Sequence, residues 1–231
     1  SFYVGTQDGT PTGITFNSDG TKMYIMGYGT DAVYQYTLST GFNPSTASYL
    51  QSFSVASQDG NPEDIAFNTD GTKMFIVGEA SNSILEYSLS TGFDISTASY
   101  SQSFSVSSQE SAARGIDFNT DGTKMFVVGT GSNSVHEYTL STGFNVSTAS
   151  FVDSFSIAAQ VSGCSSIRFS NDGAKMFILG EISDSVSEYA LSSVFDISTA
   201  SYVQSFSVAS QDGVALGLSF NSDGTKMYML G

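Results

Sequence analysis

The chain has 231 residues, a formal net charge of −15 and a sequence pI near 4.1. This charge disfavours partnership with nucleic acid or with anionic membranes, and no apolar run is long enough for insertion into a bilayer. A single cysteine excludes an intrachain disulfide, and the abundance of Ser, Thr, Gly, Asn and Asp favours an all-β, turn-rich chain over a helical one.

One segment recurs along the whole chain. It begins at Phe16 as FNSDGTKMYIMG and returns with small changes at Phe67, Phe118, Phe169 and Phe220, always 51 residues further on. The SFSV segment that precedes it recurs in the same register. A fixed period of this length indicates a repeat architecture.

The second copy shows the elements expected in each unit. Residues 64–68 predict a first strand, which ends in the turn Thr69-Asp70-Gly71, and the apolar residues 73–78 predict a second strand covered on both faces. A third strand is expected over 83–89, and a longer connection leads to a fourth over 100–107. A four-stranded unit that recurs around a ring is a propeller blade, and the ring arrangement protects the edges of the sheets. The alternative is a β-solenoid, but solenoid periods are shorter and the Asp-Gly turn favours antiparallel strands.

These residues resemble a known group of proteins. A strand that ends in an Asp-Gly turn and leads into a Lys-Met-Phe-Ile strand is similar to the blades of bacterial and viral propellers of the YVTN, NHL and WD-repeat superfamily, over the whole chain. The chain departs from the narrower families, since it has no Trp and no literal YVTN. The resemblance implies a β-propeller that binds ligands on the face of the fourth-to-first and second-to-third loops, and it implies no catalytic residue.

The fifth copy is incomplete. Residues 181–204 of the fourth copy have no counterpart in it, so a second-to-third loop, a third strand and the connection to the fourth strand are missing. Two interpretations stay open. Residues 1–231 are a single β-propeller domain whose ring is finished by residues not included here, or they are a window on a longer array of repeats.

The recurring Asn-x-Asp-Gly is also a candidate calcium loop. Such loops need several more acidic ligands, whereas here Thr or Ala and then Lys follow the Gly. A hairpin corner explains these residues better, since Asp and Asn favour turns and Gly accepts positive φ. The single His and single Cys exclude a metal site built from several such ligands. No metal site and no cofactor are expected.

A recurring amide follows the fourth strand in every copy. In a propeller these side chains lie near the central channel, where they could bind a ligand, or they could bond to neighbouring backbone and connect blades. The residues are Gln7, Gln58, Gln109, Gln160 and Gln211.

Polar residues that occur in one copy only are the second set of candidates, because a scaffold keeps its framework and varies its loops. Ion pairing between blades is the structural alternative for this set. Its members are Glu63, Asp64, Arg114, Asp117 and Arg168.

The absence of a Ser, His and acid cluster and the near-identity of the copies favour a non-enzymatic scaffold that is extracellular or exposed on a cell or virion surface. Its partner would be a protein or glycan on the loop face, and the oligomeric state is left open. The alternatives are a lectin that binds sugars between blades and a hydrolase or lyase that uses carboxylates at the central channel. If the protein is such a hydrolase or lyase, Asp117→Asn or Glu63→Gln would abolish its activity.

Overall fold

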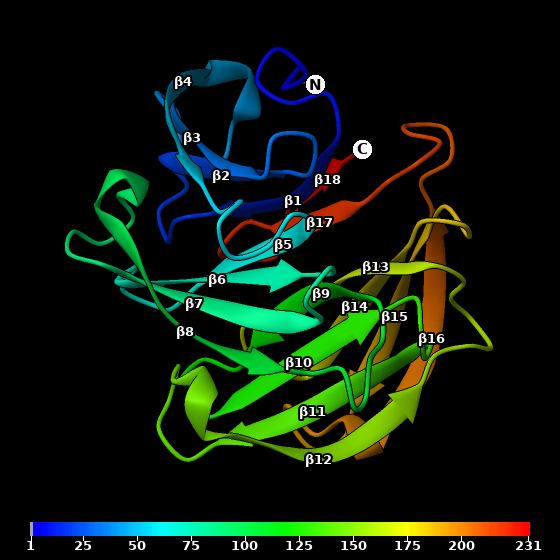
Figure 1. The fold of residues 1–231 in the computed structure, drawn as a ribbon. Coiled ribbons are helices and arrows are strands. Elements are labelled where there is room, and N and C mark those ends of the chain that lie inside the picture. The colour runs from blue at the N-terminus through cyan, green and yellow to red at the C-terminus, as the bar shows by residue number, and fades with distance from the viewer. Residues whose placement is uncertain (1) are drawn as a thin grey trace.

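The computed structural model describes residues 2–231 and shows an all-β chain folded as a β-propeller (Figure 1). Four blades are four-stranded antiparallel sheets whose strands lie in chain order. Their strands are β1 (Pro11–Phe16), β2 (Lys22–Gly27), β3 (Ala32–Leu38) and β4 (Ala47–Ser54); β5 (Pro62–Phe67), β6 (Lys73–Gly78), β7 (Ser83–Leu89) and β8 (Ala98–Ser105); β9 (Ala113–Phe118), β10 (Lys124–Gly129), β11 (Ser134–Leu140) and β12 (Ala149–Ser156); β13 (Cys164–Phe169), β14 (Lys175–Gly180), β15 (Ser185–Leu191) and β16 (Ala200–Ser207). A fifth sheet has two strands, β17 (Gly217–Phe220) and β18 (Met227–Leu230).

The predicted strands of the second copy are found with small shifts. Strands β6 and β7 have the expected bounds, whereas β5 begins at Pro62 and β8 at Ala98, both two residues earlier than expected. The connection before β8 contains a short 3-10 turn, η2 (Ile95–Thr97), whose Ser96 N–H is capped by the Asp94 carboxylate. This turn leads directly into the strand and accounts for its early start. The equivalent turns are η1 (Pro44–Thr46), η3 (Val146–Thr148) and η4 (Ile197–Thr199).

The recurring Asn-x-Asp-Gly segment forms the hairpin corner between first and second strands. In the second blade Gly71 has a φ of +72°, a conformation that favours glycine. The Asp70 carboxylate accepts hydrogen bonds from the Thr72 N–H (3.0 Å) and hydroxyl (2.6 Å), and Asn68 Oδ1 accepts one from the Lys73 N–H. Asp70 Oδ1 and the Asn68 amide oxygen are therefore used inside the turn, as expected for a corner.

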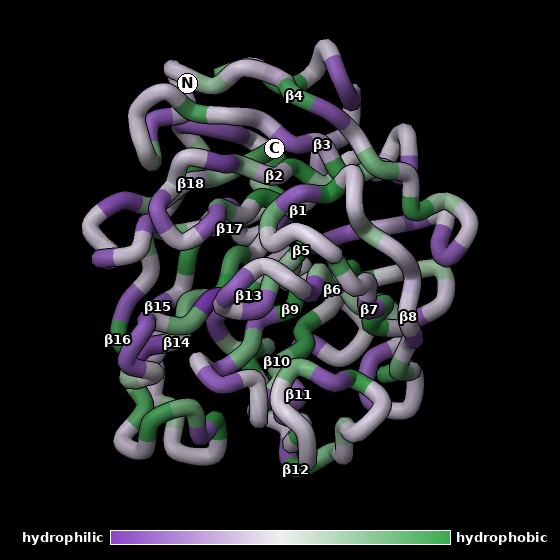
Figure 2. Tube along the Cα trace, turned by 90° about the vertical axis from the view of Figure 1, so that its left-hand side faces the viewer, coloured by the Kyte–Doolittle hydropathy of each residue, from purple (hydrophilic) through white to green (hydrophobic). Residues whose placement is uncertain are grey.

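The hydrophobic core lies between adjacent blades. One cluster joins Tyr24 and Met26 of the first blade to Ile65, Met74 and Ile76 of the second. Strand β6 is buried along its apolar run because blades cover both of its faces. In Figure 2, hydrophobic stretches follow the inner strands and hydrophilic ones lie mainly in the connecting loops.

The ring closes at the level of the inner strands, which makes the two-stranded sheet a partial fifth blade. Strands β1, β5, β9, β13 and β17 pack in ring order, and β17 returns to β1. The Tyr228 hydroxyl donates to the Phe42 carbonyl at 2.7 Å, as the Tyr24 hydroxyl does to the Phe93 carbonyl one blade further on. The first strands thus form a closed ring within residues 2–231, while residues 181–204 of the fourth copy have no counterpart in the fifth.

The N-terminal segment takes the place of the end of the fourth strand in that blade. The ring of Phe2 meets Tyr36 edge-on with centroids 5.5 Å apart, and Phe53 meets Tyr87 in the same way at 5.6 Å. Val4 is buried in the same cluster as Leu230. Both ends of the chain therefore contribute to one blade.

Candidate functional site

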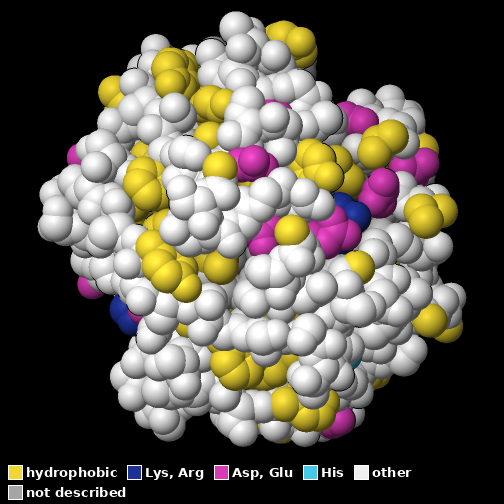
Figure 3. Space-filling view, viewed as in Figure 1, with side chains coloured by type: hydrophobic (Ala, Val, Ile, Leu, Met, Phe, Trp, Pro, Cys, Tyr) yellow, Lys and Arg dark blue, Asp and Glu magenta, His cyan; other side chains and the backbone are white. Residues whose placement is uncertain are grey.

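The first strands of the five blades surround a central channel with two ends. Each first strand starts at the fourth-to-first loop and finishes at the hairpin corner, so we call these ends the loop end and the turn end. Glu63 and Arg114 lie near the start of β5 and β9, at the loop end. Asp117 and Arg168 lie near the end of β9 and β13, toward the turn end. Figure 3 shows acidic side chains gathered around a basic one near the middle of the face it draws.

Arg168 holds the first strands together inside the channel. Its Nη1 and Nη2 atoms form a two-pronged pair with the Asp64 carboxylate at 2.9 and 3.0 Å. The same two nitrogens donate to the carbonyls of Ile116, Ile167 and, at 3.3 Å, Ile14. The guanidinium thus connects the first four blades, and Asp64 in turn accepts the N–H groups of Ile65 and Ile116. Because these groups are buried and bonded to each other, their arrangement is structural.

Asp117 borders a cavity of about 430 Å³ at the turn end, which is also lined by Arg168 and four phenylalanines of first strands. Its Oδ1 accepts the Phe118 N–H at 2.9 Å and its Oδ2 the Phe169 N–H at 2.7 Å. Burial raises the pKa of Asp117 to about 6, although Arg168 and the two N–H groups act in the opposite direction. Oδ2 therefore joins β9 to β13, and Oδ1 is used within β9.

The loop end has a second cluster, with different chemistry. Arg114 Nη1 donates to Glu63 Oε1 at 2.7 Å and Nη2 lies 3.0 Å from Glu79 Oε1. Glu63 is 4% exposed, whereas the side chains of Arg114 and Glu79 are 24% and 21% exposed. The third donor, Nε of Arg114, is buried and has no hydrogen-bond partner among residues 2–231. An unpaired buried donor is costly, so the Arg114 guanidinium is less completely bonded than its two ion pairs suggest.

The Glu63 carboxyl titrates near neutrality. Burial raises its pKa to about 7, Arg114 counteracts part of this effect, and Glu79 adds to it as a neighbouring carboxylate. A carboxyl with such a pKa is present in both protonation states at pH 7, which is the property of a general acid and base.

The recurring glutamines have one shared contact. In four of the five cases the side-chain oxygen accepts a hydrogen bond from the tyrosine hydroxyl of the third strand that follows, as Gln58 does from Tyr87 at 3.2 Å. The acidic residues that follow these glutamines accept hydrogen bonds from the loop between the second and third strands. Asp59 Oδ2, for example, accepts the Ser81 N–H. The structure thus brings the glutamines to third-strand tyrosines and does not bring them together as a ring. Gln211 has no such tyrosine within the described chain.

One polar cluster was not expected. His136 is 4% exposed, and its ring nitrogens lie between the hydroxyls of Ser132 and Ser154, each at 2.8 Å. Glu110 accepts from the Ser132 hydroxyl at 2.6 Å. Burial alone would raise the pKa of Glu110, but His136, whose Nε2 lies 3.8 Å from Glu110 Oε2, and the hydrogen bonds from Ser132 lower it to about 2. Only the unique occurrence of His136 at a third-strand position could have pointed to this cluster.

Two kinds of feature are absent from residues 2–231. No group of three or more His, Cys, Asp or Glu side chains is arranged to hold a metal ion. In the same part of the chain no helix has the length and hydropathy needed to cross a membrane.

The comparisons with known proteins identify similar folds. No protein-family model and no curated protein matches the sequence. A solved structure from Bacteroides uniformis, named as a candidate 6-phosphogluconolactonase, is 13% identical with a TM-score of 0.58 and is matched over 94% of this chain and 62% of its own. The Pseudomonas aeruginosa periplasmic gluconolactonase is also 13% identical, with a TM-score of 0.56. That match covers 96% of this chain and 57% of the gluconolactonase. A protein of unknown function from Desulfotomaculum acetoxidans is 12% identical, with a TM-score of 0.57. That match covers 95% of this chain and 62% of the other protein.

These likenesses show the fold. The chain spans about three fifths of the length of the solved structures it matches. The β-propeller fold implied by the resemblance to the YVTN, NHL and WD-repeat superfamily is confirmed. No family model assigns the chain to one of those groups. The expectation of a non-enzymatic scaffold is wrong, because the similar folds include proteins named as gluconolactonases.

Proposed function

We propose that the protein is a hydrolase that opens the ring ester of a sugar lactone at the loop end of the channel. The observation that carries this proposal is the contact between Glu63, whose pKa is about 7, and Arg114, whose Nε donor has no partner in residues 2–231. The names of the solved structures with this fold support the substrate class. An extracytoplasmic location is part of the proposal, since one of those proteins is periplasmic.

The proposed reaction uses the two side chains in separate roles. Glu63 takes a proton from a water molecule, whose oxygen attacks the lactone carbonyl carbon. Arg114 donates hydrogen bonds to the oxygen that becomes negatively charged in the tetrahedral intermediate. The intermediate then breaks the bond between the carbonyl carbon and the ring oxygen, and protonated Glu63 returns the proton to that oxygen. Lactone and water become one hydroxy acid, and the enzyme returns to its starting state.

Charge at the loop end favours a neutral lactone over a phosphorylated one. Glu63, Glu79 and Glu181 all act electrostatically on Arg114, the single cation among them. The protein as a whole carries −15. A phosphate group would therefore approach against a negative potential.

The test is hydrolysis of glucono-1,5-lactone and of its 6-phosphate, followed after subtraction of the spontaneous rate. We expect activity on the neutral lactone, and a loss of about 100-fold or more in kcat for Glu63→Gln with an unchanged circular dichroism spectrum. Glu137→Gln is the matched control. Glu137, in strand β11, is as buried as Glu63 and also pairs with a cation, Lys124, at 2.7 Å. No rate above the spontaneous one, or equal losses in both variants, contradicts the proposal.

A further inference from the structure

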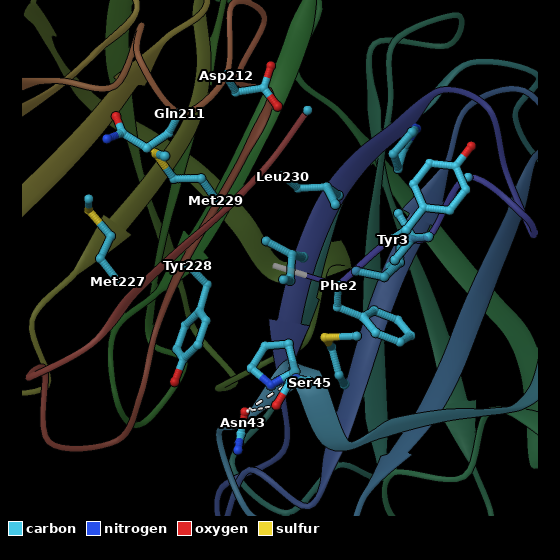
Figure 4. Close-up of a pocket in the computed structure, with 18 of the residues that line it drawn as sticks. Phe2, Tyr3, Asn43, Ser45, Gln211, Asp212, Met227, Tyr228, Met229 and Leu230 are labelled. Carbon is cyan, nitrogen blue, oxygen red and sulfur yellow. Dashed lines mark hydrogen bonds between the residues drawn. The ribbon is translucent and has the colours of Figure 1, made fainter.

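A cavity of about 580 Å³ lies beside the partial fifth blade. Figure 4 shows Met227 and Met229 on one wall and Phe2 on the other. Residues 181–204 of the fourth copy have no counterpart in this blade, so the walls are not those of a complete sheet and we assign no ligand to the cavity. The third blade has all four of its strands, and a reactive group lies on its outermost strand, β12.

Four side chains of the third blade form a relay that ends at an exposed hydroxyl. Glu110 Oε2 lies 2.6 Å from the Ser132 hydroxyl, which in turn lies 2.8 Å from His136 Nε2. The other ring nitrogen, His136 Nδ1, lies 2.8 Å from the hydroxyl of Ser154. Ser154 pairs with His136 across β11 and β12 and is exposed, whereas Glu110 and His136 are buried. None of the four takes part in the proposed lactone hydrolysis.

The hydrogen bonds assign the proton of His136 to one ring nitrogen. Although burial raises the pKa of Glu110, its hydrogen bonds lower that pKa to about 2, so both carboxylate oxygens only accept. The Ser132 hydroxyl therefore gives its single proton to Glu110, and its oxygen accepts from Nε2–H of His136. In neutral His136 the nitrogen Nδ1 is then the acceptor, and the Ser154 hydroxyl donates to it. A general base in contact with a serine hydroxyl is the arrangement that activates a nucleophile.

The first blade contains the same relay without the base. Thr30 Oγ1 lies 2.7 Å from Asp8 Oδ2 and 2.7 Å from the Tyr34 hydroxyl, at the positions of Ser132, Glu110 and His136. The relay is thus a feature of the repeat, and His136 is what the third blade adds to it.

A serine stands opposite the third-strand residue in every complete blade. A tyrosine, leucine or serine side chain does not take up a proton near neutral pH, whereas imidazole does. Within residues 2–231, Ser154 is therefore the one serine of this set that faces a base. Its equivalents are Ser52 opposite Tyr34, Ser103 opposite Leu85 and Ser205 opposite Ser187.

The surroundings of Ser154 indicate what it can react with. Phe151 is 43% exposed, and its ring centroid lies 6.4 Å from that of His136, so it offers apolar surface to a short acyl chain. The Ser154 N–H, which could stabilise an oxyanion, already donates to Asp153 Oδ1 at 2.7 Å. Hydrolysis of an acylated Ser154 is therefore expected to be slow, so that one acyl group per chain accumulates.

We propose that Ser154 is a nucleophile that takes a short acyl group from an aryl ester. Its Oγ forms a bond to the ester carbonyl carbon while its proton passes to His136 Nδ1. The tetrahedral intermediate then breaks the bond between that carbon and the aryl oxygen, and His136 returns the proton to the leaving phenol. Ester and serine become O-acylserine and a phenol, with no further reactant. Ser132 and Glu110 are positioning residues that hold the tautomer of His136.

The test mixes the whole protein with 4-nitrophenyl acetate. We expect a burst of about one equivalent of 4-nitrophenol per chain, and peptide mass spectrometry that finds the acetyl group on Ser154. The three equivalent serines are internal controls, because they share its position and lack the base. Their acetylation is expected to be about 100-fold slower or less.

Matched variants test the base and the nucleophile. Ser154→Ala should abolish the burst, and Ser103→Ala should leave it unchanged. His136→Leu introduces the residue that the second blade has at this position, Leu85, and should slow the burst about 100-fold with an unchanged circular dichroism spectrum.

Ser132 is tested by removal and rescue. Ser132→Ala should slow acetylation about tenfold, from the loss of the hydrogen bond that holds the tautomer of His136. Ser132→Thr should restore the rate, because Thr30 makes the equivalent contacts in the first blade. A structural role alone would change the Tm of Ser132→Ala and leave the acetylation rate of its folded form unchanged.

Two results would overturn the proposal. They are equal acetylation of Ser154 and its three equivalents, or none at all, and a burst that His136→Leu leaves unchanged. The reaction uses neither Glu63 nor Arg114, so Glu63→Gln should keep the burst while it loses lactone hydrolysis. Failure of either proposal therefore leaves the other untouched.

Discussion

The two arginines near the channel differ in what their donors contact. Arg168 uses Nη1 and Nη2 on Asp64 and on three carbonyls from three blades, and its side chain is 10% exposed. Arg114 lies between two glutamates, is 24% exposed and keeps an unpaired Nε. A satisfied guanidinium stabilises the ring, whereas an incompletely satisfied one beside a carboxyl that titrates near pH 7 is prepared for a ligand. The predictions that follow test this difference.

The largest effect on stability is expected for Arg168→Ala. It leaves the Asp64 carboxylate buried without its cation and removes the connection among four blades, which should cost ~3–5 kcal/mol of the free energy of unfolding. Urea denaturation followed by circular dichroism measures this loss. Arg114→Ala is the comparison variant and should cost clearly less, because its partners are at the loop end and Glu63 can take up a proton. Equal losses in the two variants would show that the arginines do not differ in this way.

The next effect is a dependence of stability on pH that arises from Glu63. Its folded-state pKa of about 7 lies above the usual 4.5, so the folded protein holds this proton more tightly than the unfolded chain. The resulting stability is complete below about pH 4.5 and is lost as the pH rises through 7, with a magnitude of at most ~3 kcal/mol. Denaturation at several pH values should show this loss in the wild type and in Glu137→Gln, and a smaller one in Glu63→Gln. An unchanged pH dependence in Glu63→Gln would contradict the raised pKa.

The sequence predicts the blade well and the channel poorly, for physical reasons. Strands β6 and β7 are recognisable because turn residues and apolar runs are local signals that recur in every copy. The contact of Arg168 with Asp64 joins residues 104 positions apart, and nothing near either residue indicates the other. Glu63, Asp64, Arg114, Asp117 and Arg168 were identified only as a set, and the structure divides them between two clusters.

Arg114→Gln should move the pH dependence of the lactonase reaction. The positive charge of Arg114 counteracts the rise in the pKa of Glu63 caused by burial, so its removal should raise that pKa further. The pH at which kcat/KM is half-maximal is therefore expected to increase from about 7 by about one unit. A lower kcat/KM with an unchanged midpoint would show that Arg114 contacts the substrate but has no electrostatic effect on Glu63.

The smallest effect, and the one that most directly separates the two clusters, is expected for Asp117→Asn. Like Glu63, Asp117 has a raised pKa, about 6, yet both of its oxygens already accept backbone N–H groups, one from Phe118 in β9 and one from Phe169 in β13. The amide keeps one acceptor and places an NH₂ group against the other N–H, so at pH 8 the variant should lose ~1 kcal/mol of stability with kcat/KM for the lactone unchanged. Because the raised pKa of Asp117 makes the wild type more stable as the pH falls below 6, the difference in stability between the wild type and Asp117→Asn should become larger there. A loss of kcat comparable to that of Glu63→Gln, with folding intact, would instead move the reaction to the turn-end cavity that Asp117 shares with Arg168.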